Sequence, residues 1–121
     1  MNTAATDYSN HRKHRRVYLG TDIAVYDVLN GDRVGEIVNL TIEGLMLVME
    51  QEPEAGNIYQ FAMSLPQDLD GHKVINVGAD CLWCSPSSIA GQHWAGFQII
   101  DASDTAERLI QHLIDTYGTD S

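Results

Sequence analysis

The sequence predicts a mainly β fold, an antiparallel barrel or sandwich, followed by one C-terminal α-helix. Two observations favour this fold. Several short apolar segments are divided by turn-rich pieces with no helical pattern between them. Near the end of the chain, apolar residues recur at the spacing of one helix face. The length of 121 residues and the hydrophobic content of 44 % suit one packed domain.

A hairpin is expected to open the barrel. The segment Tyr18 to Leu29 is rich in Val, Ile, Ala and Tyr, which is typical of a strand. Asn30-Gly31 follows and predicts a type I′ turn, because both residues tolerate a positive φ. Arg33 to Leu40 is then the returning strand. Later strands are expected at Leu45 to Met49, Ile58 to Leu65, Val74 to Cys84 and Trp94 to Ile100, with turns at Glu50 to Asn57, Pro66 to Gly71 and Ser85 to Gln92.

The final helix has the clearest pattern. Asp104 is expected to cap its N-terminus, with Glu107 as the partner of a capping box, and Gly118 is expected to end it. This helix should pack its apolar face on the barrel. That face comprises Ala106, Leu109, Ile110, Leu113, Ile114 and Tyr117.

We expect residues 1–10 to form a flexible polar arm and residues 11–121 to form a single domain. The longest apolar run is Leu45 to Met49, far shorter than the roughly 20 residues of a membrane-spanning helix. Residues 1–10 also lack the apolar centre of a signal peptide. A cytoplasmic protein without membrane insertion is therefore expected.

The charge is distributed unevenly along the chain. The net charge is −10, yet four of the seven Lys and Arg residues lie between Arg12 and Arg16. From Val17 onward, three basic residues face sixteen acidic ones. Such an acidic body would repel a long phosphate backbone, so we do not expect binding to long nucleic acids. A compact basic cluster is better suited to one small anionic ligand.

The basic cluster contains an Arg-x-x-x-Arg motif formed by Arg12 and Arg16. Each guanidinium group can grip a phosphate, or the edge of a guanine, with two parallel hydrogen bonds. On an extended segment, residues four apart point to the same side, so both arginines can reach one ligand. Arg15 belongs to the same cluster and is a further candidate ligand-binding residue, although it would face the other way. The alternative for this segment is a solvated basic tail.

A second motif, Asn-x-Thr-x-x-Gly, is formed by Asn39, Thr41 and Gly44. If Arg33 to Thr41 is a strand, Asn39 and Thr41 lie on one face, about 6.6 Å apart. Their amide and hydroxyl groups can then hydrogen-bond one ligand. Gly44 would permit a tight turn or a close approach of the backbone to the ligand. The alternative is an ordinary turn in which Asn and Thr bind their own backbone.

In this order, the two motifs resemble the PilZ family, whose signature is Arg-x-x-x-Arg followed by Asp/Asn-x-Ser-x-x-Gly. Cys81-Leu82-Trp83 is similar to the late apolar strand of the family, and Ala95-Gly96-Phe97-Gln98-Ile99 to its Gly-x-x-Phe strand. The terminal helix also has a counterpart there. The resemblance covers residues 11–117. Threonine stands at 41 where the family usually has serine, and isoleucine at 99 where it often has phenylalanine.

The resemblance implies a six-stranded β-barrel that binds the bacterial second messenger cyclic di-GMP. Arg12 and Arg16 would take the phosphates and guanine edges, Asn39 and Thr41 the base or sugar-phosphate, and Gly44 would shape the turn. It further implies a sensor or adaptor, without enzymatic activity or cofactor, that orders its arginine segment over the nucleotide and signals to an unidentified downstream protein. The alternative is a ligand-free PilZ-like protein-interaction domain, and a small single-stranded nucleic-acid-binding barrel is a third reading.

The remaining motifs of the sequence do not indicate a metal site or an enzyme. Cys81-x-x-Cys84 suggests a metal or redox site, but residues three apart on a strand point to opposite faces, and a second cysteine pair is missing. We therefore expect core thiols and no metal. Trp83, Trp94 and Phe97 are expected to fill the barrel, and the alternative is that an aromatic side chain near its mouth stacks on a guanine. No nucleophile elbow, phosphate-binding loop or zinc-protease motif indicates an enzyme.

Overall fold

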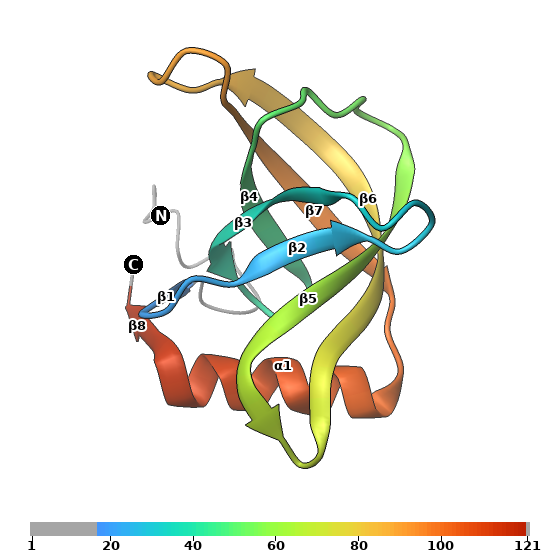
Figure 1. Cartoon of the computed structure of the whole chain (residues 1–121), viewed down its shortest axis with the longest axis vertical. Helices are drawn as coiled ribbons and strands as arrows, with labels where there is room; N and C mark the ends of the chain where they lie inside the picture. Colours follow the sequence, from blue (N-terminus) through green and yellow to red (C-terminus); the bar gives the residue numbers. More distant parts are fainter. Residues whose placement is uncertain (1–16, 121) are drawn as a thin grey trace, which may run out of the picture.

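The computed structural model describes residues 17–120, and in these residues six antiparallel strands close into a barrel (Figure 1). Each strand pairs with its neighbour around the ring, and the pairing of β2 with β3 closes it. The predicted six-stranded barrel followed by a helix is confirmed. In ring order the strands are β2 (Ala24–Asp27), β5 (Ile58–Leu69), β6 (His72–Pro86), β7 (His93–Asp101), β4 (Gly44–Met49) and β3 (Arg33–Leu40).

Two short strands, β1 (Val17–Leu19) and β8 (Gly118–Asp120), extend the sheet beyond this ring. The first half of β3 pairs with β2 and its second half with β1, while β8 pairs only with β1. The prediction of one continuous strand from Tyr18 to Leu29 was therefore wrong. The chain bends between β1 and β2 because these strands bind different halves of the same neighbour.

The helix α1 (Asp104–Tyr117) lies across one end of the barrel (Figure 1) and buries its apolar face as predicted. Its N-cap is Ser103 rather than Asp104. The Ser103 hydroxyl oxygen accepts a hydrogen bond from the Ala106 backbone N–H at 3.0 Å, because Ser103 has the extended backbone of a cap residue. Gly118 ends the helix as predicted, and its N–H donates to the Ile114 carbonyl.

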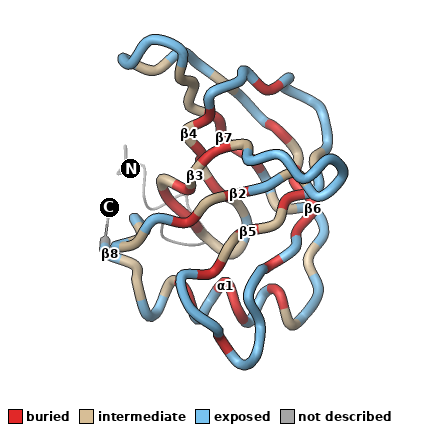
Figure 2. The backbone as a smooth tube through the Cα atoms, in the orientation of Figure 1, coloured by how far each residue is buried: buried red, intermediate tan, exposed pale blue. Residues whose placement is uncertain are grey.

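Aromatic and aliphatic side chains fill the barrel interior. Figure 2 marks the buried residues in red along the backbone. The Phe61 ring contacts Phe97 edge-to-face, with 5.1 Å between centroids, and stacks with Tyr59 at 5.6 Å. Both phenylalanines are almost fully buried. The prediction that Phe97 fills the barrel is confirmed.

The type I′ turn occurs at a different hairpin from the one predicted. Asp70 and Gly71, which join β5 to β6, both have positive φ, at 51° and 82°. In the β2–β3 hairpin only Gly31 has a positive φ, and its N–H donates to the Asp27 carbonyl in a longer loop. The Asn30-Gly31 pair therefore makes a wider turn than expected.

Candidate functional site

A β-bulge on β3 decides where Asn39 points. Ile37 is opposite Leu47 and Asn39 is opposite Met46, so Val38 is an extra residue in the pairing. Leu47 faces the core and Met46 faces outward, since side chains alternate along β4. Without the extra residue, Asn39 would point into the barrel. The bulge instead places Asn39 on the outer face and returns Leu40 to the core, where it is fully buried.

A second bulge, on β6, places Trp83 on the outer face in the same way. Cys81 is opposite Phe97 and Trp83 is opposite Gly96, which leaves Leu82 as the extra residue. Trp83 consequently lies on the outer face and is 41 % exposed. The prediction that Trp83 fills the barrel was therefore wrong, because the bulge interrupts the alternation on which it was based.

The two bulges align side chains from five neighbouring strands in one row across the outer face. Directly opposite residues in antiparallel strands point to the same face, so the register defines the row. With strands about 4.8 Å apart, the row is about 19 Å long. We call it the Asn39 row, and it comprises Trp83 on β6, Gly96 on β7, Met46 on β4, Asn39 on β3 and Tyr18 on β1.

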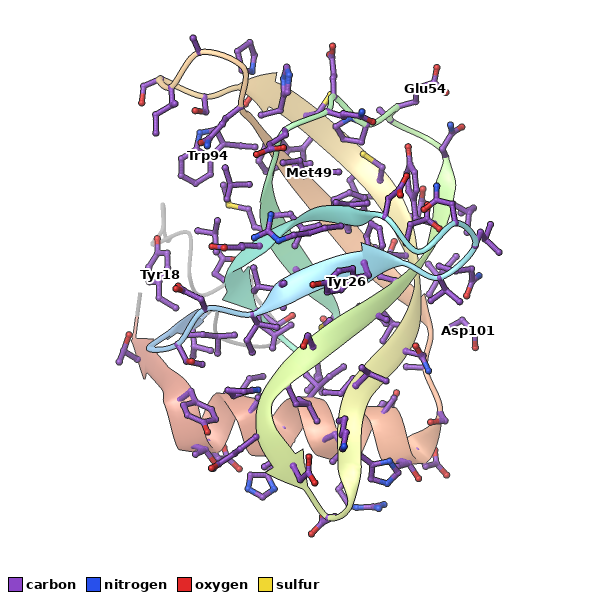
Figure 3. All side chains as sticks on the ribbon, in the orientation of Figure 1. Tyr18, Tyr26, Met49, Glu54, Trp94 and Asp101 are labelled. Carbon is purple, nitrogen blue, oxygen red and sulfur yellow. The ribbon has the colours of Figure 1, made fainter. Side chains whose placement is uncertain are left out.

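The two ends of the row are aromatic, and its polar member, Asn39, lies between Met46 and Tyr18. The Trp83 indole lies directly over Gly96, where any side chain would collide with it. Tyr18, at the other end, is 45 % exposed and projects outward from β1 (Figure 3). Asn39 is only 6 % exposed, and its Nδ2 donates to the Met46 sulfur at 3.5 Å. The side-chain oxygen of Asn39 has no hydrogen-bond partner among the described residues.

A second tryptophan lies on the adjoining outer row. Trp94 on β7 is opposite Val48 on β4, one outward position along from Met46. It is partly exposed and does not belong to the barrel core, so its prediction as a core residue was also wrong. Trp94 projects from the same side of the molecule as Tyr18 in Figure 3. The outer face is thus more aromatic than the sequence suggested.

Thr41 and Gly44 shape the turn that follows Asn39. β3 ends at Leu40, so Thr41 belongs to the turn rather than to the strand. Its hydroxyl oxygen accepts hydrogen bonds from the Glu43 and Gly44 N–H groups, both at 3.0 Å. The Thr41 hydroxyl thus binds its own backbone, and its contact with a ligand stays a prediction. Gly44 allows a close approach of strands, since a Cβ there would lie 2.7 Å from the Phe97 carbonyl oxygen.

The remaining predicted site residues, Arg12, Arg15 and Arg16, lie outside the described residues, as does the predicted flexible arm at residues 1–10. The Asn39 row itself has no charged side chain. Of the three basic residues that follow Val17, Arg33 binds Glu36 in an ion pair of 2.6 Å. The described part of the site therefore offers aromatic surface and one amide, without a cation.

The family model of the PilZ domain matches residues 10–116. The chain belongs to the PilZ family. The match includes both motifs, Arg12 to Arg16 and Asn39 to Gly44, and ends within α1. No curated protein sequence matches the chain.

Solved PilZ structures share the fold. The PilZ domain of YcgR from Escherichia coli, solved with c-di-GMP, matches with a TM-score of 0.69 and 17 % identity, over 88 % of this chain and 91 % of that one. The Bacillus subtilis inhibitor of motility MotI/DgrA matches with a TM-score of 0.67 and 14 % identity, over 87 % of this chain and 50 % of that one. The Borreliella burgdorferi PlzA protein in complex with c-di-GMP matches with a TM-score of 0.59 and 12 % identity, over 90 % of this chain and 53 % of that one. The chain spans about half the length of MotI/DgrA and of PlzA.

The two cysteines of this PilZ domain both turn toward the interior, against the expectation that they diverge. The bulge at Leu82 shifts the alternation, so that Cys81 is buried and Cys84 packs against the core. Burial, followed by the nearby Cys84, raises the pKa of the Cys81 thiol. Desolvation and the Glu52 carboxylate raise the pKa of Cys84. Raised pKa values keep both thiols protonated, which disfavours thiolate chemistry.

Within residues 17–120, the PilZ domain has no helix long and apolar enough to span a membrane. The same residues contain no group of three or more His, Cys, Asp or Glu side chains arranged to hold a metal ion. Among the described residues, the candidate site is the Asn39 row. Strand alternation around Leu45 and Leu47 was the available signal for Met46, but nothing in the sequence marked the bulges that expose Trp83.

Proposed function

We propose that this chain is a receptor domain for cyclic di-GMP, which binds across the Asn39 row under the arginine segment. One observation carries the proposal: β1 begins at Val17, directly after Arg16 in the sequence, and Tyr18 is paired with Asn39. The register therefore brings the chain that follows the first motif beside the second motif. The known relatives solved with c-di-GMP support the choice of ligand.

The chemistry of the Asn39 row suits a nucleotide with two purines. Trp83 and Tyr18 present exposed aromatic surface on which a base can stack, which contributes about 1–3 kcal/mol per base. The Asn39 amide can accept from and donate to a guanine edge once it exchanges the weak sulfur contact for a ligand atom. Thr41 then acts indirectly, by holding the turn that follows Asn39.

The charge needed to bind two phosphates comes from Arg12, Arg15 and Arg16. The row has no cation of its own, and the body that surrounds it is acidic, so the arginine segment is indispensable in this proposal. Each charge-assisted hydrogen bond contributes about 1.5–3 kcal/mol. Ordering the segment costs about 1–2 kcal/mol per residue, so binding and ordering are coupled. Such coupling suits a sensor that signals to a downstream protein, without catalysis and without a cofactor.

The proposal is tested by calorimetric titration of the purified chain with cyclic di-GMP. We expect saturable binding, with no comparable heat from GTP or from the linear dinucleotide pGpG. Circular dichroism on the same sample shows whether the barrel is folded. A folded protein that releases no heat would instead support the alternative, a ligand-free PilZ-like protein-interaction domain. Equal binding of random single-stranded oligonucleotides would support the nucleic-acid-binding barrel.

Gly96→Ala should weaken cyclic di-GMP binding although Gly96 itself has no side chain to contact a ligand. The added methyl group would occupy the space of the Trp83 indole and displace the ring from the row. Loss of one stacking contact predicts an affinity reduced about 5- to 150-fold, measured by titration. Trp83→Ala should have a similar effect, and the double variant should lose no more than either single variant. Additive losses would mean that Gly96 acts by another route than Trp83.

A further inference from the structure

The strand β8, which lies outside the barrel, is attached to the strand that leads from the arginine segment. Val17, Tyr18 and Leu19 pair antiparallel with residues 120, 119 and 118. The Thr119 hydroxyl donates to the Tyr18 carbonyl at 3.2 Å, and the Gly20 N–H donates to the Tyr117 carbonyl at 2.8 Å. Tyr18 is the member of the Asn39 row that β1 contributes. The end of α1 is thereby linked to the candidate ligand site.

Among residues 17–120, β8 provides more of the pairing of β1 than β3 does. β1 pairs with β3 at two positions, Val17 with Leu40 and Tyr18 with Asn39, but with β8 at three. The ring of six strands closes through the pairing of β2 with β3, and β1 is not part of it. Of the six strands, β3 is the one with which the described part of β1 pairs. Isolated pairs of short strands are marginal in water, and removing β8 would leave the described part of β1 with its two pairs to β3.

The position of β8 is itself fixed by the helix. Gly118 packs between Val17 and the Ile114 carbonyl, where a Cβ would collide with that carbonyl oxygen and lie 3.0 Å from the Val17 side chain. Leu113, one residue before Ile114, is fully buried in the core. The helix thus packs on the core, and β8 follows it directly and pairs with β1.

We propose that β8 is a positioning element of the nucleotide site. It holds β1, and through β1 it fixes the point from which the arginine segment and Tyr18 reach the ligand. By thermodynamic linkage, bound nucleotide stabilises the pairing of β1 with β8 by the same free energy. This inference rests on the proposed function and adds that the C-terminal strand responds to occupancy of the site.

Thr119→Pro is the variant that tests it. Hydrogen-bonded pairs alternate along an antiparallel ladder, so the bond from Gly20 to Tyr117 makes Tyr18 and Thr119 the next hydrogen-bonded pair. Proline removes the N–H of residue 119, and the extended backbone of Gly118, with φ −76° and ψ 142°, accepts a following proline. We expect cyclic di-GMP affinity to fall about fivefold to tenfold. Thr119→Val keeps the N–H and should retain affinity within about twofold.

A double-mutant cycle separates positioning from general damage. If β8 acts through the arginine segment and Tyr18, Thr119→Pro should change affinity less when Arg16 is already alanine than in the wild type, because one of the groups that β1 positions is then absent. Thermal unfolding by circular dichroism should show that the barrel of Thr119→Pro remains folded, because β8 lies outside the ring. Hydrogen exchange of the wild-type chain adds an independent measurement: the amides of residues 17–20 and 118–120 should exchange more slowly with nucleotide than without it.

The outcomes distinguish this inference from the proposed function. Wild-type protein that binds the nucleotide, with Thr119→Pro binding equally well or exchange at 118–120 unchanged, overturns the positioning role and leaves the receptor function intact. An additive effect of Thr119→Pro and Arg16→Ala overturns it as well. Wild-type protein that does not bind overturns both.

Discussion

Replacing Arg16 with alanine should lower the affinity for cyclic di-GMP by about 30- to 150-fold, which corresponds to about 2–3 kcal/mol. The reason is the distribution of charge: the Asn39 row has aromatic surface and an amide but no cation, and the body around it is acidic. Arg16 directly precedes β1, whose Tyr18 is paired with Asn39, so its guanidinium has the shortest connection to the row. Isothermal titration calorimetry at fixed ionic strength measures the change.

Two further variants make this prediction specific. Arg16→Lys keeps the charge but loses the flat fork of donors, so it should recover only part of the affinity. Arg108→Ala removes the same charge from the exposed side of α1 and should bind as the wild type does. Equal losses in Arg16→Ala and Arg108→Ala would show that net charge alone, rather than a contact with the ligand, governs affinity.

The largest effect on stability is expected from Phe61→Ala, which should lower the free energy of unfolding by about 3–5 kcal/mol. Phe61 is fully buried at the centre of the barrel, where it contacts both Tyr59 and Phe97. Alanine would leave a cavity lined by these rings, which belong to different strands and cannot close it without moving them. Urea denaturation followed by circular dichroism measures the loss.

Ile58→Ala, on the same strand, is the matched control because Ile58 is 55 % exposed. It should change the unfolding free energy by less than about 0.5 kcal/mol. A loss as large as that of Phe61→Ala would mean that the outer face of β5 is covered in solution. A small loss for Phe61→Ala would contradict the packing around that ring.

Much of the fold followed from local chemistry. Arg33 to Leu40 forms a strand with the expected bounds, and α1 buries the predicted apolar face. The helix cap differed by one residue, since a serine and an aspartate are adjacent and both residue types cap helices well. Only the backbone conformation, extended at Ser103, decides between them.

The site was harder to predict because it depends on register between strands. Asn39 and Trp83 face outward only because one extra residue, Val38 or Leu82, precedes each of them. Bulges are set by the partner strand and the closure of the barrel, neither of which a residue pattern contains. Tyr18 joins the row for the same reason, through pairing with a residue 21 positions later in the chain. Motif spacing identified Asn39, but it did not reveal its aromatic neighbours.

The closure of the ring without β1 and β8 has a consequence for how the domain responds. When these two strands separate, the six strands of the ring keep their pairing with one another, and β3 loses its pairing with β1 at Asn39 and Leu40. The local opening is therefore expected to require far less free energy than global unfolding. The domain thus combines a stable six-stranded ring with a pair of short strands, β1 and β8, that can separate from it. Under the proposed function, amino-acid changes in β1 and β8 are expected to adjust the affinity for the nucleotide while the six-stranded ring keeps its melting temperature.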